Sequence, residues 1–197
     1  MIRNIVFDVG KVLVTFEPRK YLEQLGYDET TVEAVMRAVF LSELWLENDR
    51  GNLTITELEK GFVANAPEYE VQIKHAFQNV GEIIELMPYA MDWIKELKKQ
   101  GYHLYIISNY GESTYQQTEH KLKFLPYMDG AIFSYRHKMI KPDREIYELL
   151  LERYGLKAHE CVFIDDCFEN VEGARKVGFY GIHFLDYQQA KEELKKI

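Results

Sequence analysis

The stretch Ile5-Val6-Phe7-Asp8-Val9-Gly10-Lys11 decides the fold expected of this chain. Its three apolar residues have the length of a short strand buried on both faces, and Asp8 closes the run. A second apolar run, 161–164, closes in the same way on Asp165 and Asp166. Strand ends so far apart in sequence meet at one edge only in a parallel sheet, so the two acidic positions predict an α/β fold with a shared carboxylate site.

The rest of the expected core alternates between strand and helix patterns. Two segments have apolar residues on one helical face and are followed by a glycine, 89–100 before Gly101 and 143–154 before Gly155. This alternation predicts βαβ crossovers and a doubly wound parallel sheet. The segments expected as strands are 2–7, 103–107, 131–133, 161–164 and 181–184.

One long segment breaks the alternation. Residues 18–87 contain several helical patterns and no convincing strand, and one helix is expected to open at a capping box from Thr54 to Glu57. We therefore expect a helical cap, 18–87, inserted after the first strand, and a core made of 1–17 and 88–197. A cap in this position would lie over the carboxyl ends of the strands, where α/β folds bind ligands.

Composition excludes several classes of protein. The chain has 197 residues, of which 47% are hydrophobic, and a net charge of −8. The excess of acidic residues and the lack of a basic stripe predict no nucleic-acid partner. No secretory leader or spanning apolar segment is visible, so we expect a cytoplasmic protein with no membrane partner. Cys161 and Cys167 are not in a metal-ligand pattern and the six histidines are scattered, so no zinc site is predicted.

Polar groups close or follow four of these runs. Ser108 and Asn109 follow the run 103–107 and precede a helical stretch, an arrangement that suits an anion such as phosphate. Lys141 precedes a helix and supplies a fixed cation. The oxygens of Asp165 and Asp166, joined by those of Asn170, are the hard ligands that Mg²⁺ prefers. With Asp8, these groups predict a Mg²⁺-assisted phosphoryl site.

At this point the chain resembles the haloacid dehalogenase superfamily, in its capped, phosphatase-like branch. Single motifs of this kind are weak, but four in this order are specific and span nearly the whole chain. The resemblance implies a Rossmann-like core and the helical cap described above. The motifs are Ile5 to Gly10, Ile106-Ile107-Ser108-Asn109, Ile140-Lys141-Pro142, and Phe163-Ile164-Asp165-Asp166 followed by Asn170.

The resemblance also implies roles for these residues. Asp8 would attack phosphorus to give an aspartyl phosphate, while Ser108 and Lys141 would hold the phosphoryl oxygens. Asn109 and Arg50 are further candidates for substrate binding, Arg50 because the segment 45–51 is similar to the cap loop that faces the substrate in this branch. Mg²⁺ would bind Asp8, the Gly10 carbonyl and Asp166, with Asp165 as a further candidate ligand and Asn170 nearby.

One position departs from the family pattern. Most phosphatases of the superfamily carry a second Asp two residues after the nucleophile, where it protonates the leaving oxygen and later activates water, and this chain has Gly10 there. Positioned proton transfer typically contributes about 10²–10⁴-fold to a rate, so its loss should slow the chemistry. The Asp-x-Gly form is similar to a subgroup that contains a bacterial α-glucose-1-phosphate phosphatase. Glu17 and Asp49 are candidates to replace the missing acid.

The leading hypothesis is a Mg²⁺-dependent phosphatase that acts on a small phosphorylated metabolite, with sugar phosphates as the first candidates. An impaired relative that binds phosphate or a partner without turnover is the main alternative, because Gly10 lacks the proton donor. A phosphomutase is less favoured because it needs proton transfer twice. A 2-haloacid dehalogenase is less favoured because a metal-free site for a carboxylate substrate gains nothing from Asp165 and Asp166. A homodimer stays open.

Overall fold

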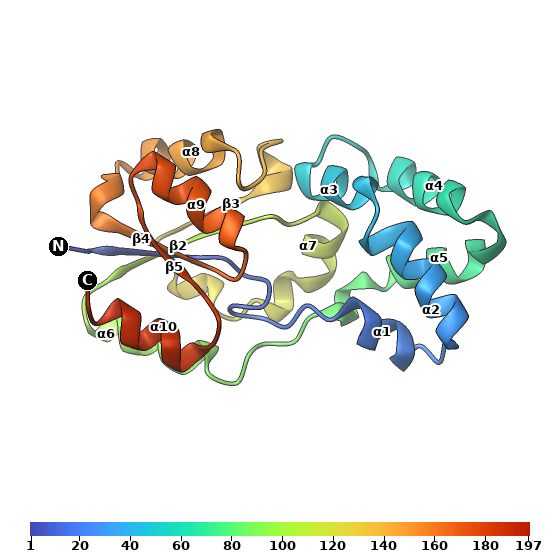
Figure 1. The fold of residues 1–197 in the computed structure, drawn as a ribbon, viewed down its shortest axis with the longest axis horizontal. Helices are drawn as coiled ribbons and strands as arrows, with labels where there is room; N and C mark the ends of the chain where they lie inside the picture. The colour runs from blue at the N-terminus through green and yellow to red at the C-terminus, as the bar shows by residue number, and fades with distance from the viewer.

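The computed structural model describes residues 1–197, and its centre is one sheet of five parallel strands (Figure 1). The strand order is β3-β2-β1-β4-β5, so β1 lies in the middle with β2 on one side and β4 on the other. This order confirms the predicted doubly wound parallel sheet. The strands are β1 Asn4–Phe7, β2 His103–Ser108, β3 Gly130–Phe133, β4 Cys161–Asp165 and β5 Tyr180–His183.

Helices cover both faces of the sheet (Figure 1). Helices α6 (Ala90–Lys99) and α10 (Tyr187–Leu194) lie on one face, and α8 (Arg144–Tyr154) and α9 (Phe168–Val177) lie on the other. Successive side chains of a strand point to opposite faces of the sheet. Phe7 therefore packs against Trp93 of α6 on one face, while its neighbour Val6 lies in the apolar cluster of the other face, which contains Tyr147 of α8. The two faces of β1 thus anchor two apolar layers, which hold the strand ends in fixed positions.

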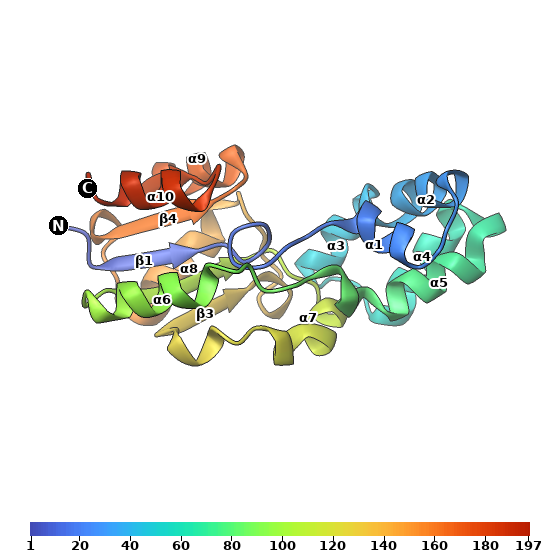
Figure 2. The same ribbon diagram turned by 90° about the horizontal axis from the view of Figure 1, so that it is seen from below.

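A second lobe consists of helices alone (Figures 1 and 2). The capping box predicted at Thr54 is present, since the Thr54 hydroxyl accepts from the Glu57 amide and Glu57 accepts from the Thr54 amide. The helices are α1 Pro18–Gln24, α2 Glu29–Val35, a π-helix η1 Met36–Phe40, α3 Glu43–Arg50, α4 Ile55–Asn65 and α5 Glu70–Gln78. The short 3₁₀ helices of the chain are η2 Pro67–Tyr69, η3 Val80–Ile83, η4 Glu119–Lys121, η5 Leu125–Tyr127, η6 Ser134–Arg136 and η7 Ala158–Glu160.

Two chain segments join the lobes, and they pair with each other (Figure 2). The Thr15 amide donates to Glu85 O at 2.8 Å, and the Met87 amide donates to Leu13 O at 3.0 Å. Helix α7 (Glu112–Thr118) of the core also contacts this region, because the Gln117 side chain accepts from the Gly81 amide. The division at residues 17/18 and 87/88 stays a prediction, although α1 begins at Pro18.

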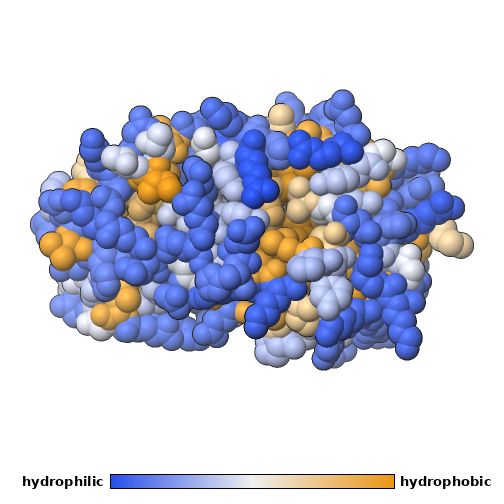
Figure 3. All heavy atoms as spheres, turned by 180° about the vertical axis from the view of Figure 1, so that it is seen from behind, coloured by the Kyte–Doolittle hydropathy of each residue, from blue (hydrophilic) through white to orange (hydrophobic).

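The surface is polar over most of the face shown in Figure 3, with apolar atoms gathered near the middle of the molecule. A cavity lies where the lobes meet, and it is lined by residues of both. None of the helices has both the length and the apolar character needed to cross a bilayer.

Candidate active site

The cavity begins at the carboxyl end of β1, where Asp8 follows the last strand residue. The Asp8 amide donates to Ile164 O of β4 at 2.9 Å, so the backbone that carries the carboxylate is part of the sheet ladder. Asp165 ends β4 on one side of Asp8. The structure therefore brings Asp8 and Asp165 together from distant parts of the sequence, as the parallel sheet predicted.

Lys141 lies between these two carboxylates. Its Nζ is 2.8 Å from Asp8 Oδ1 and 2.6 Å from Asp165 Oδ2, and only 1% of its side chain is exposed. Burial alone would lower the pKa of Lys141, but the charges of Asp165 and Asp8 outweigh it and raise the pKa. The ammonium group is therefore a permanent cation in the site, in contact with the predicted nucleophile.

The backbone of Lys141 is held by Asn109. The Asn109 Oδ1 accepts from the Lys141 amide at 2.8 Å, and Asn109 Nδ2 donates to the Lys141 carbonyl at 3.1 Å. The sequence predicted Asn109 as a substrate ligand. It does line the cavity, so that role stays a prediction, but its amide is already engaged in positioning Lys141.

Asp165 and Asp166 have different environments despite being adjacent. Asp165 is fully buried and its oxygens accept from Lys141, from Asn170 Nδ2 and from the Cys167 amide. Asp166 lines the cavity and its carboxylate lies 3.6 Å from Lys11 Nζ. Burial, reinforced by Asp165, raises the pKa of Asp166. Asp165 therefore orients Lys141, whereas Asp166 faces the open space.

The donor set fits a divalent cation. One carboxylate oxygen from each of Asp8, Asp165 and Asp166 can be chosen so that all three lie within 4.8 Å of one another. Gly10 lines the same cavity and offers a backbone carbonyl. Burial raises the pKa of Asp8 to about 7 against the opposing charge of Lys141. A hard cation that prefers oxygen ligands would relieve this concentration of carboxylates, and the Asp165 oxygens are already committed to hydrogen bonds.

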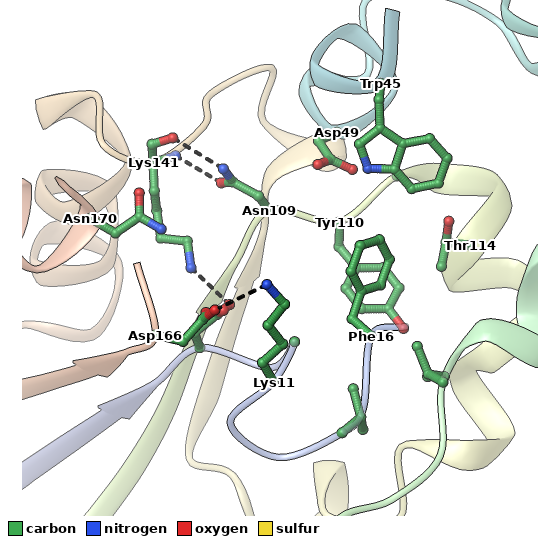
Figure 4. A pocket seen from close by; sticks show the side chains of 15 residues that line it. Lys11, Phe16, Trp45, Asp49, Asn109, Tyr110, Thr114, Lys141, Asp166 and Asn170 are labelled. Carbon is green, nitrogen blue, oxygen red and sulfur yellow. Dashed lines mark hydrogen bonds and ion pairs between the residues drawn. The ribbon is translucent and has the colours of Figure 1, made fainter. Parts of the chain in front are cut away.

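The cavity has a volume of about 180 Å³ and two chemically distinct ends (Figure 4). The charged end contains the groups described above together with Lys11. The other end is apolar, with Phe16 and the Tyr110 ring near the Trp45 indole of the helical lobe. Thr114 also lines it, and its buried hydroxyl has no hydrogen-bond partner in the protein. A ligand with an anionic group and a less polar remainder matches these two ends.

Of the acids proposed to replace the missing proton donor, only one lies in the cavity. Asp49 projects from α3 into it, beside Trp45 (Figure 4). Glu17 is not among the lining residues and pairs with Lys20 on the surface. Gly10 does not approach any side chain closely, since an added Cβ would meet nothing nearer than Phe16 Cβ at 4.0 Å.

Two other predicted residues do not line the cavity. Ser108 is 1% exposed at the end of β2, and Arg50 forms ion pairs with Glu47 and with Asp143 at 3.3 Å. Substrate binding by Ser108 and Arg50 therefore stays a prediction. The contact from Arg50 to Asp143 instead links the helical lobe to the start of α8.

Sequence reasoning missed several lining residues. Lys11 adopts a positive φ of 56°, which turns the chain shortly after Asp8. Nothing in the sequence except its nearness to Asp8 indicates that Lys11 lines the cavity. Phe16 and Thr114 carry no such signal either, and Trp45 is expected near the substrate only as part of the segment 45–51. An aromatic side chain in a sequence reads as core whether it faces the interior or a cavity, so only the fold distinguishes the two.

The chain matches known proteins along nearly its whole length. The family model of haloacid dehalogenase-like hydrolases matches residues 2–178. The sesquiterpene phosphatase astK of Aspergillus oryzae is 27% identical over 98% of this chain and 94% of its own. The D-ribitol-5-phosphate phosphatase of Bacteroides thetaiotaomicron is 26% identical over 91% and 90%.

A solved structure shares the fold. A HAD family enzyme of Bacteroides thetaiotaomicron in complex with magnesium and inorganic phosphate superimposes with a TM-score of 0.73, at 22% identity over 96% of this chain and 99% of that one. The parallel sheet, the inserted helices and the Asp8–Lys141–Asp165 cluster agree with the family match. The chain therefore belongs to the haloacid dehalogenase-like hydrolases.

Proposed function

We propose that this protein is a Mg²⁺-dependent phosphatase that hydrolyses a small phosphorylated metabolite through a phosphoryl group on Asp8. The observation that carries the proposal is the contact between Asp8 and a buried Lys141 at 2.8 Å, on the wall of a cavity that also presents Asp166. The names of the two phosphatases similar to this chain support the same chemistry.

Each residue of the site has its own role in the proposed reaction. Asp8 is the nucleophile, and its backbone is fixed in the sheet, so the carboxylate does not have to be ordered during the reaction. Lys141 offsets the negative charge of Asp8 and of the phosphoryl oxygens, and Asp165 and Asn109 hold it in place. Asp8, Asp166 and the Gly10 carbonyl would hold Mg²⁺, which when bound supplies further positive charge to the phosphoryl group.

The substrate's leaving group faces the apolar end of the cavity. Sugar phosphates remain the first candidates, because an aromatic wall such as that of Phe16 and Trp45 can stack on a sugar face. The same wall favours a second class, phosphate esters of apolar alcohols. Thr114 is the one residue at this end with an unpartnered buried hydroxyl, so a single oxygen of the leaving group would have a partner there.

A panel of phosphate esters tests this proposal. We expect inorganic phosphate to be released from at least one of sugar 1-phosphates, sugar 5- or 6-phosphates, alditol phosphates and prenyl phosphates, only with Mg²⁺, and not by Asp8→Asn. Binding of phosphate without release from any ester would support the alternative of a protein that binds without turnover. An isomerised phosphosugar would indicate a mutase, and halide release that survives EDTA would indicate a dehalogenase.

A further inference from the structure

The active site has space for a proton donor at Gly10 but no group there. Outside its chain neighbours, the nearest atom to an added Cβ at Gly10 is Phe16 Cβ at 4.0 Å, so a side chain could begin there without a clash. Both half-reactions of a phosphatase nevertheless move a proton, first to the leaving oxygen and then from water. A titratable group elsewhere on the cavity wall is therefore required if the enzyme is to hydrolyse unactivated esters.

We propose that Asp49 of helix α3 is the catalytic acid and base that replaces this group. The inference rests on the proposed phosphatase function and adds a residue from the helical lobe to the reaction. Apart from the nucleophile Asp8 and the candidate metal ligand Asp166, Asp49 is the only carboxylate that lines the cavity. It also comes from helix α3 of the helical lobe, whereas Asp8 and Asp166 follow the neighbouring strands β1 and β4 of the core.

The position of Asp49 is determined by contacts on both sides of it in the sequence. The Ser134 hydroxyl of the core donates to the Asp49 carbonyl. The preceding residue, Asn48, is 1% exposed and packs so closely on Gly111 that a Cβ there would overlap its amide. The helix ends at Gly51, whose left-handed φ of 77° lets it pack against the Tyr135 backbone. The last turn of α3 is therefore docked on the core, and the Asp49 carboxylate does not depend on a flexible loop.

The surroundings favour the protonated form of Asp49 near neutral pH. Burial raises its pKa to about 7, although the side chain is only partly buried by accessible area. The charge of Lys141 and a hydrogen bond from the Asn48 side-chain amide lower the pKa of Asp49, whereas the charge of Asp8 raises it. The last turn of a helix also carries partial negative charge, which disfavours a carboxylate. Burial, opposed in part by Lys141, thus leaves Asp49 able both to give and to accept a proton near neutral pH.

Asp49 gives one proton and regains one over the two steps of the reaction. In the first step an Asp8 oxygen bonds to phosphorus, the bond from phosphorus to the ester oxygen breaks, and the Asp49 carboxylic acid gives its proton to that oxygen, which leaves as an alcohol. In the second step water attacks phosphorus and gives a proton to the Asp49 carboxylate, while the bond from phosphorus to Asp8 breaks. The products are the alcohol and inorganic phosphate, and both carboxyl groups return to their starting states.

A matched pair of esters separates proton donation from other effects. The leaving group of 4-nitrophenyl phosphate departs without a proton, whereas that of 4-nitrobenzyl phosphate needs one, and the two are similar in size. In single turnovers with enzyme in excess, we expect Asp49→Asn to release 4-nitrobenzyl alcohol about 10²–10⁴-fold more slowly than the wild type and 4-nitrophenol less than about tenfold more slowly. Glu17→Gln, the other candidate acid, lies outside the cavity and is expected to match the wild type on both esters.

Restoring an acid at the vacant position gives a second, independent readout. A Cβ at Gly10 meets no atom closer than 4.0 Å, and we expect Gly10→Asp in an Asp49→Asn background to recover about tenfold or more of the lost rate on the benzyl ester. Equal losses on both esters, with no recovery, would overturn the acid and base role and leave Asp49 as a positioning residue. If the wild type releases nothing from these two esters or from the panel of metabolite esters, or if Asp8→Asn is as active as the wild type, the proposed phosphatase function fails instead.

Discussion

Replacing Lys141 with Met tests how far the buried charges of the site depend on one another. The substitution keeps the length of the side chain but removes the Nζ that lies 2.8 Å from Asp8 and 2.6 Å from Asp165. Asp165 has no exposed surface, so its carboxylate would remain buried without its cation. Removing one partner of such a pair typically costs about 3–5 kcal/mol, a large part of the roughly 5–15 kcal/mol that stabilises a domain.

Urea unfolding of the metal-free protein measures this cost. Tryptophan fluorescence reports on both lobes, because Trp93 lies in the core with its ring centroid 5.0 Å from that of Phe7 and Trp45 lies in α3, and circular dichroism provides a second probe. We expect Lys141→Met to lower the free energy of unfolding by about 3–5 kcal/mol. The matched control is Lys11→Met, because Lys11 is 59% exposed and 3.6 Å from Asp166, and an exposed pair contributes at most about 1 kcal/mol.

A double-mutant cycle identifies the source of the loss. Asp165→Asn removes the negative charge that Lys141 neutralises. Lys141→Met should therefore cost less stability in the Asp165→Asn background than in the wild type, with a coupling energy of about 0.5–3 kcal/mol between the two substitutions. A loss below about 1 kcal/mol for Lys141→Met, or additive effects in the cycle, would refute the view that Lys141 and Asp165 form a coupled buried pair.

Three further predictions concern the cavity. Gly111→Ala should cost about 1–3 kcal/mol and lower activity, because the new methyl group overlaps Asn48, and thermal melts should show that Asn48→Ala relieves the loss. Asp49→Asn should stabilise the protein, by up to about 4 kcal/mol, because the unfolded chain ionises Asp49 near its ordinary pKa of 3.8 and the folded chain only near 7. The free energy of unfolding of the wild type therefore falls relative to that of the variant as pH rises from about 4 to about 7. Urea midpoints of the two proteins that differ by the same amount at about pH 4 and about pH 7 would contradict this. EDTA should abolish phosphate release and added Mg²⁺ should restore it, and Asp166→Asn should raise the Mg²⁺ concentration needed.

The core of the fold follows from short-range patterns in the sequence. Runs such as 161–164 are apolar throughout, which is typical of strands covered on both faces, and their ends carry the polar residues. Asp8 and Asp165 could be expected to meet because parallel strands end at one edge, and they do, with Lys141 from the loop before α8 in contact with both. The capping box at Thr54 was likewise readable, because both of its hydrogen bonds are local.

The parts that could not be predicted depend on contacts between distant segments. Nothing local indicates that the Thr15 amide pairs with Glu85, or that the Asn109 amide is used to hold the Lys141 backbone. The π-helix Met36–Phe40 has no sequence signal distinct from that of an α-helix. The sequence offers Asp49 and Glu17 as candidate acids, and only the fold shows that Asp49 lines the cavity and that its helical turn packs on the core through Asn48 and Gly111.

The most direct test of the central claim is to trap the phosphoryl group on the enzyme. The protein is mixed with an activated ester such as 4-nitrophenyl phosphate and Mg²⁺, quenched in acid within one turnover, digested, and mapped by mass spectrometry. We expect a phosphoryl group on the peptide that contains Asp8, at higher occupancy in Asp49→Asn and absent in Asp8→Asn. Release of phosphate by the wild type with no phosphoryl group on Asp8 in either active form would contradict it.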